Sequence, residues 1–223
     1  MRNIRLFAVI SVVVLAAACH KAEPQIEAYG SLQMNMQISE QTKAQTEADL
    51  YASAIVNIYK KDFSGLVRSY PYTEMPSPFY LAVGDYRVDV LAGECMESDP
   101  AAASWENRSY KGSKEFTIQE NQTSSVEVTA YVSNAVTAIS FDSTVEENFI
   151  SGYELTIGLD QENSSAVLTY DASKSGAEGY FIVDGLIDPS FVWTFNGTLA
   201  KKGEPFTKSG KIEGIEAGKL YKM

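Results

Sequence analysis

Residues 79–91 have the sequence FYLAVGDYRVDVL, and this stretch decides the fold class. An apolar run over 79–83 is followed by Gly84-Asp85, after which apolar and polar residues alternate from Tyr86 to Leu91. Alternation with period two is typical of a half-buried strand, and Gly-Asp between two such runs is a two-residue hairpin signal. The stretch therefore predicts two antiparallel strands joined by a tight turn.

Strand patterns recur at short spacing on both sides of this stretch. Residues 31–38 alternate strictly, and a second alternation covers 52–58. Three prolines within 70–78 predict a loop there, because proline lacks the N–H that a strand interior needs. Residues 39–50 are polar and acidic and predict a loop or a turn of helix. The next predicted strands are 115–118, 126–132 and 136–141.

The second half of the chain has the same style. The predicted strands are 153–159, 166–170, 180–183, 191–199, 205–212 and 220–222. Turn-forming residues separate them, with Asn196-Gly197 and Lys201 to Gly203 among the predicted turns, and only 145–151 suggests a helical turn. The sequence predicts an all-β chain of two tandem antiparallel β-sandwich modules, 30–133 and 134–223.

The N-terminus has the pattern of an export signal. Arg2 and Arg5 precede an apolar run over 6–15, and three alanines stand directly before Cys19. A cysteine at this place is the mark of a bacterial lipoprotein box, although leucine stands four residues before it rather than three. We expect residues 1–18 to be removed, Cys19 to be lipidated and residues 19–29 to form a tether. The alternative is an ordinary cleaved signal followed by a chance cysteine.

These features predict a lipid-anchored, surface-exposed protein of the outer membrane. Two or more acyl chains suffice for stable anchoring. The formal charge of −11 argues against nucleic acid and against electrostatic attachment to anionic lipid. The remaining cysteine, Cys95, has no partner in the chain if Cys19 carries lipid, and we expect a small buried side chain, a free thiol or a link between chains.

The sequence lacks the residues that nucleophilic catalysis, zinc binding and phosphate binding require. The single histidine is His20, within the tether, where it cannot orient a nucleophile or help to form a zinc site. No glycine-rich phosphate loop is present. Acidic residues gather at Asp142, Glu146 and Glu147 and again at Asp160 and Glu162. We interpret both groups as solvated loops, with calcium binding or glycosidase chemistry as alternatives. The sequence predicts no enzyme, no cofactor and no metal site.

Four stretches carry a family resemblance: 78–90, 110–118, 134–142 and 153–157. They resemble strands and hairpins of transthyretin-like and fimbrillin-like surface β-sandwiches of Bacteroidota, and are similar to a family of gut-bacterial lipoproteins of unassigned function. The resemblance implies a two-part β-sandwich related to pilus subunits and anchors, and it brings no catalytic residue. Polymerising fimbrillins lose an N-terminal strand by cleavage after an arginine. Here no arginine lies between Arg5 and Arg68, which favours an anchor, an accessory subunit or a stand-alone protein.

Two hypotheses for function follow. The first is a structural or adhesive surface protein whose fimbrial or other partner adds a strand to an exposed sheet edge, with 31–38 as the strand to watch. The second is a glycan-binding module that uses aromatic residues of loops 70–80 and 100–110, with Tyr72, Tyr80 and Trp105 as candidate ligand-binding residues. The alternative for Trp105, which the sequence favours, is a core position.

Overall fold

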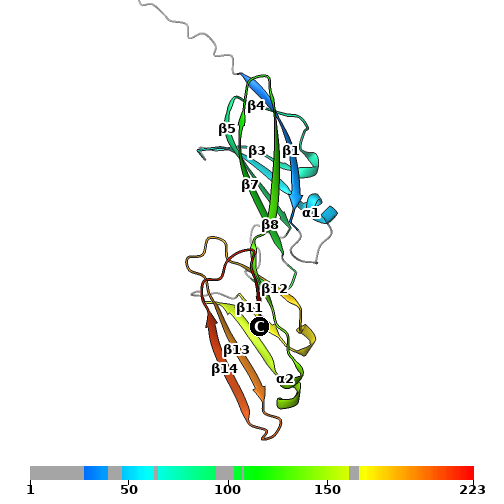
Figure 1. Ribbon diagram of the computed structural model, residues 1–223, viewed down its shortest axis with the longest axis vertical. Coiled ribbons are helices and arrows are strands. Elements are labelled where there is room, and N and C mark those ends of the chain that lie inside the picture. The colour runs from blue at the N-terminus through cyan, green and yellow to red at the C-terminus, as the bar shows by residue number, and fades with distance from the viewer. Residues whose placement is uncertain (1–27, 40–46, 63–64, 94–102, 107, 161–165) are drawn as a thin grey trace, which may run out of the picture.

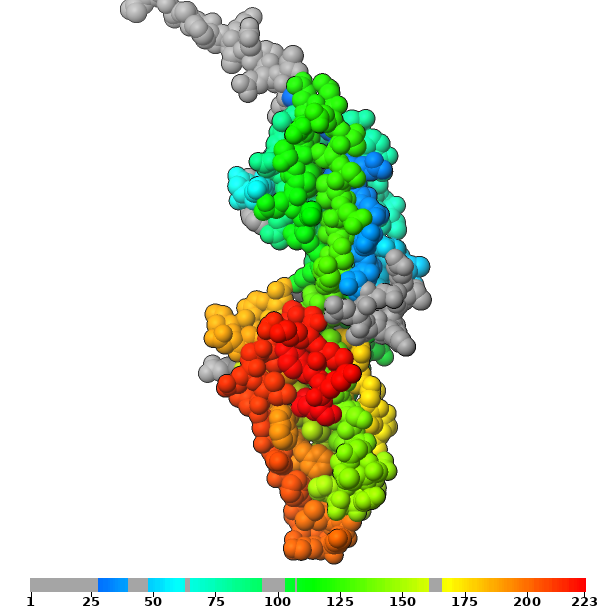
Figure 2. All heavy atoms as spheres, in the orientation of Figure 1, coloured from blue at the N-terminus to red at the C-terminus, as the bar shows by residue number. Residues whose placement is uncertain are grey.

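The computed structural model describes residues 28–39, 47–62, 65–93, 103–106, 108–160 and 166–223. The predicted leader, Cys19, His20 and Cys95 lie outside the described residues. The molecule is elongated and is built almost entirely of strands, which confirms the predicted all-β fold class (Figure 1). Figure 2 shows a narrowing between its two ends. Each end contains its own cluster of buried apolar side chains, and we call the two ends the N-terminal lobe and the C-terminal lobe.

The N-terminal lobe contains a seven-stranded sheet in the order β3-β2-β5-β7-β8-β1-β4. The strands are β1 (Tyr29–Ile38), β2 (Ile55–Lys60), β3 (Leu66–Pro71), β4 (Phe79–Ala82), β5 (Gly84–Gly93), β7 (Ser109–Ile118) and β8 (Thr123–Val132). β7 and β8 pair only at Tyr110–Val132 and Lys111–Tyr131. Beyond this seam the sheet forms two layers, because side chains of β1, β4 and β8 share one core with those of β2 and β5. Gly112 permits the close approach at the seam, where a Cβ atom would lie 2.5 Å from the Thr129 carbonyl oxygen.

The hairpin predicted over residues 79–91 is wrong, although both of its strands exist. β4 pairs with β1, whereas β5 pairs with β2 and β7. Gly84, at φ +153°, begins β5, and the chain crosses from one layer to the other there instead of reversing within one sheet. The physical reason is burial: Phe79 and Leu81 enter the core from one layer, and Tyr86 enters it from the other. Shared burial overrides the local turn signal.

β1 is an interior strand of a mixed sheet. It pairs in parallel with β8 and antiparallel with β4, so the sheet is not purely antiparallel as predicted. Its side chains Leu32 and Met36 are buried in the core. β3 was not predicted, and the loop expected over 70–78 is wrong at its first two residues, which end this strand. Pro71 is tolerated because it ends an edge strand and needs no ladder partner on its outer side.

The C-terminal lobe contains two four-stranded sheets, in the orders β11-β10-β13-β14 and β15-β9-β12-β6. The strands are β6 (Ala103–Ser104), β9 (Asn134–Ala138), β10 (Glu154–Leu159), β11 (Val167–Tyr170), β12 (Glu178–Ile182), β13 (Phe191–Thr198), β14 (Pro205–Ile212) and β15 (Leu220–Lys222). These bounds confirm the strands predicted for the second half. The turn predicted at Asn196-Gly197 is wrong because both residues lie inside β13; the turn follows at 199–204, where the Gly203 N–H donates to the Leu199 carbonyl.

Helices are short. They are α1 (Glu47–Ser53), α2 (Ser143–Asn148) and the 3-10 turns η1 (Tyr72–Glu74) and η3 (Ala172–Lys174). α2 confirms the helical turn predicted in this part of the chain. Asp142 caps it by accepting a hydrogen bond from the Thr144 N–H at 2.8 Å.

The two lobes meet at the start of β7. Arg108 is only 1% exposed and donates to the hydroxyl groups of Tyr110 (3.2 Å) and Tyr180 (2.5 Å) and to the Glu178 carboxylate (2.9 Å). Lys111 forms an ion pair with Asp184. β8 ends at Val132 and β9 begins at Asn134, but β6 belongs to a sheet of the C-terminal lobe. The predicted division of the chain at 133–134 stays a prediction.

Candidate functional site

The three aromatic residues predicted as ligand-binding lie in different surroundings. Tyr72 is half-buried; its hydroxyl accepts a hydrogen bond from the Met36 N–H at 3.2 Å, and its ring lies 5.7 Å from that of Tyr51. Trp105 is half-buried in the C-terminal lobe, where its ring meets that of Tyr170 edge-on at 4.7 Å. Tyr80, on β4, is 67% exposed. The structure does not bring the three side chains together.

Tyr80 instead belongs to a hollow of about 350 Å³ between β3 and β4. We call it the edge hollow, because β3 and β4 are the two edge strands of the seven-stranded sheet. Its lining residues are Tyr29, Lys60, Val67, Arg68, Phe79, Tyr80, Leu81, Ala82 and Tyr86. Both layers therefore contribute to the lining, and the rings of Tyr70 on β3 and Phe79 on β4 lie 5.5 Å apart, between the two layers.

Two exposed tyrosines lie on one side of the edge hollow. Tyr29 is 50% exposed and pairs with Ala82, while Tyr80 pairs with Ser31. The two tyrosines are therefore diagonal neighbours on the same face of the β1–β4 pair, a separation that aromatic side chains bridge. Their ring faces and hydroxyl groups can meet one ligand.

Two cations lie on the other side. Lys60 donates to the Tyr86 hydroxyl at 2.9 Å, with its Nζ 4.3 Å from the Tyr86 ring centroid, and Tyr86 in turn donates to the Ala82 carbonyl. Arg68 Nη1 donates to the Val67 carbonyl at 2.9 Å. Within the described ranges, neither cation has a carboxylate partner at ion-pair distance, and the residues that line the edge hollow include no acid.

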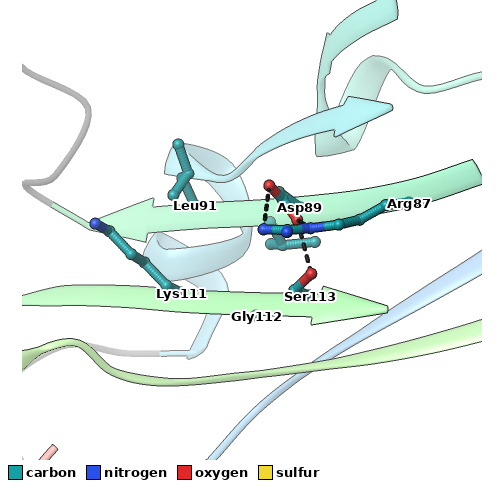
Figure 3. A pocket seen from close by; sticks show the side chains of 7 residues that line it. Arg87, Asp89, Leu91, Lys111, Gly112 and Ser113 are labelled. Atoms are coloured by element: carbon teal, nitrogen blue, oxygen red, sulfur yellow. Dashed lines mark hydrogen bonds and ion pairs between the residues drawn. The ribbon is translucent and has the colours of Figure 1, made fainter. Parts of the chain in front are cut away.

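A second, smaller depression of about 220 Å³ lies on the outer face of β5 and β7 (Figure 3). Arg87 forms a bidentate pair with Asp89, at 2.6 and 2.9 Å, and Ser113 donates to the same carboxylate at 2.8 Å. The hydrogen bond to Asp89 raises the pKa of Arg87. Lys111, at the rim, pairs with Asp184 of the other lobe. Because these charges already have partners, we interpret this depression as a polar surface that stabilises the sheet.

The free edge of β14 is a third candidate. β14 pairs with β13 over all eight of its residues and has no neighbour on its other side among the described strands. The Leu199 N–H donates to the Glu204 carbonyl, and bonded and non-bonded pairs alternate along an antiparallel ladder. Thr207, Ser209 and Lys211 therefore direct their backbone N–H and C=O groups away from β13.

One carboxylate of each predicted acidic group has a structural role, and the predicted loop is wrong for Glu146 and Glu147, which lie on α2. Hydrogen bonds from Thr144 lower the pKa of Asp142 as it caps α2. Lys211 lowers the pKa of Asp160 through an ion pair of 2.8 Å. Glu162 lies outside the described residues. In the part of the chain that is described, no three His, Cys, Asp or Glu side chains are grouped to hold a metal ion. No described helix has the length and apolar composition needed to cross a membrane.

Residues 28–223, which include every described element, match the family model described as Domain of unknown function (DUF4493). The chain belongs to this family. No curated protein matches the sequence.

Two Bacteroides proteins are among the solved structures with a detectable likeness. A candidate polysaccharide-binding protein (DUF1812) of Bacteroides thetaiotaomicron is 11% identical, with a TM-score of 0.44 over 79% of this chain and 78% of that one. A proposed cell adhesion protein of Bacteroides eggerthii is 9% identical, with a TM-score of 0.45 over 88% and 84% of the two chains. Such low scores transfer no residue role to this DUF4493 chain.

Sequence reasoning found one member of the edge hollow, Tyr80, and missed its neighbours. Tyr29 was placed in the tether and Arg68 lies in the strand that was not predicted. Lys60 ends β2 and meets the hollow only because β2 and β4 lie in facing layers. A local sequence pattern cannot predict this site, because two sheet edges that are distant in sequence form it together.

Proposed function

We propose that this chain is a non-enzymatic, lipid-anchored cell-surface protein with an adhesive or structural role, which binds its partner by strand addition to β14. The observation that carries the proposal is the free eight-residue edge of β14. An added strand gains affinity from main-chain hydrogen bonds and specificity from alternate side chains. The necessary N–H and C=O groups come from Thr207, Ser209 and Lys211, which are every second residue along β14.

The edge is selective. Pro205 removes the N–H at its first position, and Lys208 and Lys211 are the kind of side chain with which proteins prevent unspecific pairing of free edges. Lys211 already pairs with Asp160, so Lys208 is the lysine that an acidic side chain on the added strand can pair with, at a gain of roughly 0.2–1 kcal/mol. We therefore expect the partner segment to be extended and acidic.

The position of β14 suits a surface contact. The described chain begins at one end of the molecule, and the hairpin of β13 and β14 extends toward the opposite end (Figure 1). With acyl chains on Cys19 and the residues before β1 as the tether, the C-terminal lobe would be held away from the membrane. β14 would then be accessible to other surface proteins.

β1, by contrast, is a fixed part of the fold in this proposal. Pairing on both sides and the burial of Leu32 and Met36 make it unsuitable for exchange without loss of the N-terminal core. This arrangement fits an anchor, an accessory subunit or an adhesin better than a polymerising subunit that exchanges its first strand.

The alternative function is glycan binding by loops 70–80 and 100–110. Of the three aromatic residues predicted for it, one is exposed. Tyr72 and Trp105 pack against the two cores, whereas Tyr80 is exposed beside the edge hollow. The loops as such therefore lose support, and any glycan site shifts to the edge hollow.

The test is a cross-linking pull-down of the full chain from intact cells. In T207P/S209P the outward N–H groups are lost while those that pair with β13 remain. T207V/S209A changes the same side chains but keeps every N–H. We expect the proline variant to lose the co-purified partner and the control to retain it, with circular dichroism showing both folded. Equal recovery of partners by the folded proline variant, or no partner with the wild-type chain, would overturn the proposal.

A further inference from the structure

We infer that the edge hollow binds an acidic saccharide, with the sugar ring on the Tyr29 and Tyr80 side and its carboxylate or sulfate against Lys60 and Arg68. The site differs from β14 in place and chemistry, and it stands independently of strand addition. The lobe that carries it contains β1, the first described strand of the chain (Figure 1).

The charges favour an anionic ligand. The whole chain carries a formal charge of −11, yet the lining of the edge hollow has two cations and no carboxylate. Lys60 and Arg68 come from different strands and converge on one space. Asp62 and Asp85 line a neighbouring hollow, which also includes Lys60 and Lys61, and so lie beside the site rather than in it.

Both cations retain hydrogen-bonding capacity. An ammonium group has three N–H donors and a guanidinium five. Lys60 directs one donor to the Tyr86 hydroxyl, and Arg68 directs one to the Val67 carbonyl. Those contacts orient the two side chains and leave donors for a carboxylate or sulfate, to which charged hydrogen bonds are stronger than neutral ones.

The tyrosines favour a sugar as the carrier of that anion. Tyr29 and Tyr80 expose half or more of their surface, which is unusual for aromatic side chains that merely fill a core. Each offers an apolar ring face with a hydroxyl at its tip, the combination that suits a pyranose with C–H groups on one face and hydroxyl groups at its edge. The volume of about 350 Å³ falls within the range of small-molecule sites, about 300–1,000 Å³.

Other anions fit less well. Nucleic acid requires a stripe of Lys and Arg along a face, and the edge hollow has only two cations in an acidic chain. A bare inorganic anion would use the cations and would not engage the exposed ring faces of Tyr29 and Tyr80. The saccharide is the ligand that engages both sides of the hollow.

The test is calorimetric titration of the full chain in detergent micelles. The probes are a uronate oligosaccharide, a sulfated glycosaminoglycan fragment, the neutral methyl ester of the uronate, and inorganic sulfate. We expect at least one acidic saccharide to bind and the neutral ester to bind about tenfold more weakly. No binding of either acidic saccharide, equal binding of the ester, or inorganic sulfate as tight as the saccharide would overturn the inference.

Variants assign the binding to the hollow. K60Q/R68Q and Y80A should each weaken binding about tenfold, whereas Y80F should retain most of it because the ring remains. Y131A and K114Q, at exposed positions of β8 and β7, are matched controls and should bind like the wild type. Unchanged binding by folded K60Q/R68Q would contradict the inference. T207P/S209P should bind the saccharide normally, so failure of strand addition and failure of this site are distinguishable.

Discussion

Arg108 links the two lobes through its side chain, which reaches Tyr110 of one lobe and Tyr180 of the other. It is almost completely buried among Tyr110, Tyr180 and Glu178, and its guanidinium lies 5.0 Å from the Tyr180 ring centroid. Burial works to lower the pKa of Arg108, but the hydrogen bonds with Tyr110 and Tyr180 raise it. A buried charge of this kind is tolerated only because its hydrogen-bond partners are in place.

Replacement of Arg108 by Met should therefore lower the free energy of unfolding by about 3 kcal/mol, because the tyrosine hydroxyls lose a partner in a buried place. R108K should recover only part of this loss, since an ammonium group lacks the planar fork of Arg. Urea denaturation checks both variants. A change below about 1 kcal/mol for R108M would show that the junction does not rely on this side chain.

We expect the protein to lose stability in alkali because Tyr170 and Tyr180 are buried. Burial raises the pKa of each to about 12, above the ordinary value of 10.0. The protonated hydroxyl groups of these tyrosines contribute fully to the free energy of unfolding below pH 10. That contribution disappears as the pH rises toward 12, because the unfolded chain loses the hydroxyl protons at a lower pH than the folded chain does. The urea midpoint should fall between pH 10 and 12, and Y170F should fall less steeply. Parallel curves for Y170F and the wild type would contradict this origin.

At the scale of the element, β1 should be indispensable to the N-terminal lobe. Leu32 is fully buried between the two layers, and truncation of such a side chain leaves a cavity. L32A should lower the free energy of unfolding by about 3 kcal/mol, within the range for buried leucines. Chemical denaturation followed by tyrosine fluorescence measures it. A folded lobe after deletion of residues 29–38 would show instead that β1 is exchangeable.

Gly210 should be equally sensitive on β14. The Trp193 ring lies across it, and a Cβ atom there would come within 2.5 Å of that ring. G210A should displace Trp193 and lower the free energy of unfolding by about 1–3 kcal/mol, the usual cost of overpacking. G152A is a matched control for crowding alone: Gly152 has open space around it but a φ of +102°, so its cost arises from backbone strain. A red shift of tryptophan fluorescence in G210A, absent in G152A, is the expected signature.

The local sequence pattern predicted the positions of most strands, but it predicted few of the strand pairings. β9 to β15 lie where alternation and turn residues placed them, apart from the turn expected at Asn196-Gly197, because each strand buries one face. The hairpin over 79–91 failed because Phe79 and Tyr86 enter the same core from opposite layers, which is decided by contacts distant in sequence. The same limit hid Lys60 and Arg68 from the candidate site while Tyr80 was found.

At the scale of the whole molecule, the two proposed binding surfaces lie in different lobes of an acidic, elongated protein. The edge hollow lies in the N-terminal lobe, and the free edge of β14 lies in the C-terminal lobe (Figures 1 and 2). The junction around Arg108 and the Lys111–Asp184 ion pair joins them. We therefore expect the two binding events to be separable by mutation while the lobes keep their arrangement.

The proposed lipid anchor makes a further prediction at the scale of the whole molecule. C19A should abolish acylation and release the chain from the membrane fraction, because attachment of an acidic protein depends on its acyl chains. Detergent phase partition and mass spectrometry of the N-terminal peptide measure both effects. Persistence of C19A in the membrane fraction would indicate an attachment other than lipid.

The most direct test of the central claim is a photo-cross-linking amino acid at position 209 of the full chain on intact cells, with position 131 as the control. Ser209 directs its backbone to the free edge of β14, whereas Tyr131 is exposed on the N-terminal lobe. We predict that position 209 captures an acidic extended segment of one partner and that position 131 does not. Identical capture at both positions, or none at position 209, would contradict strand addition at β14.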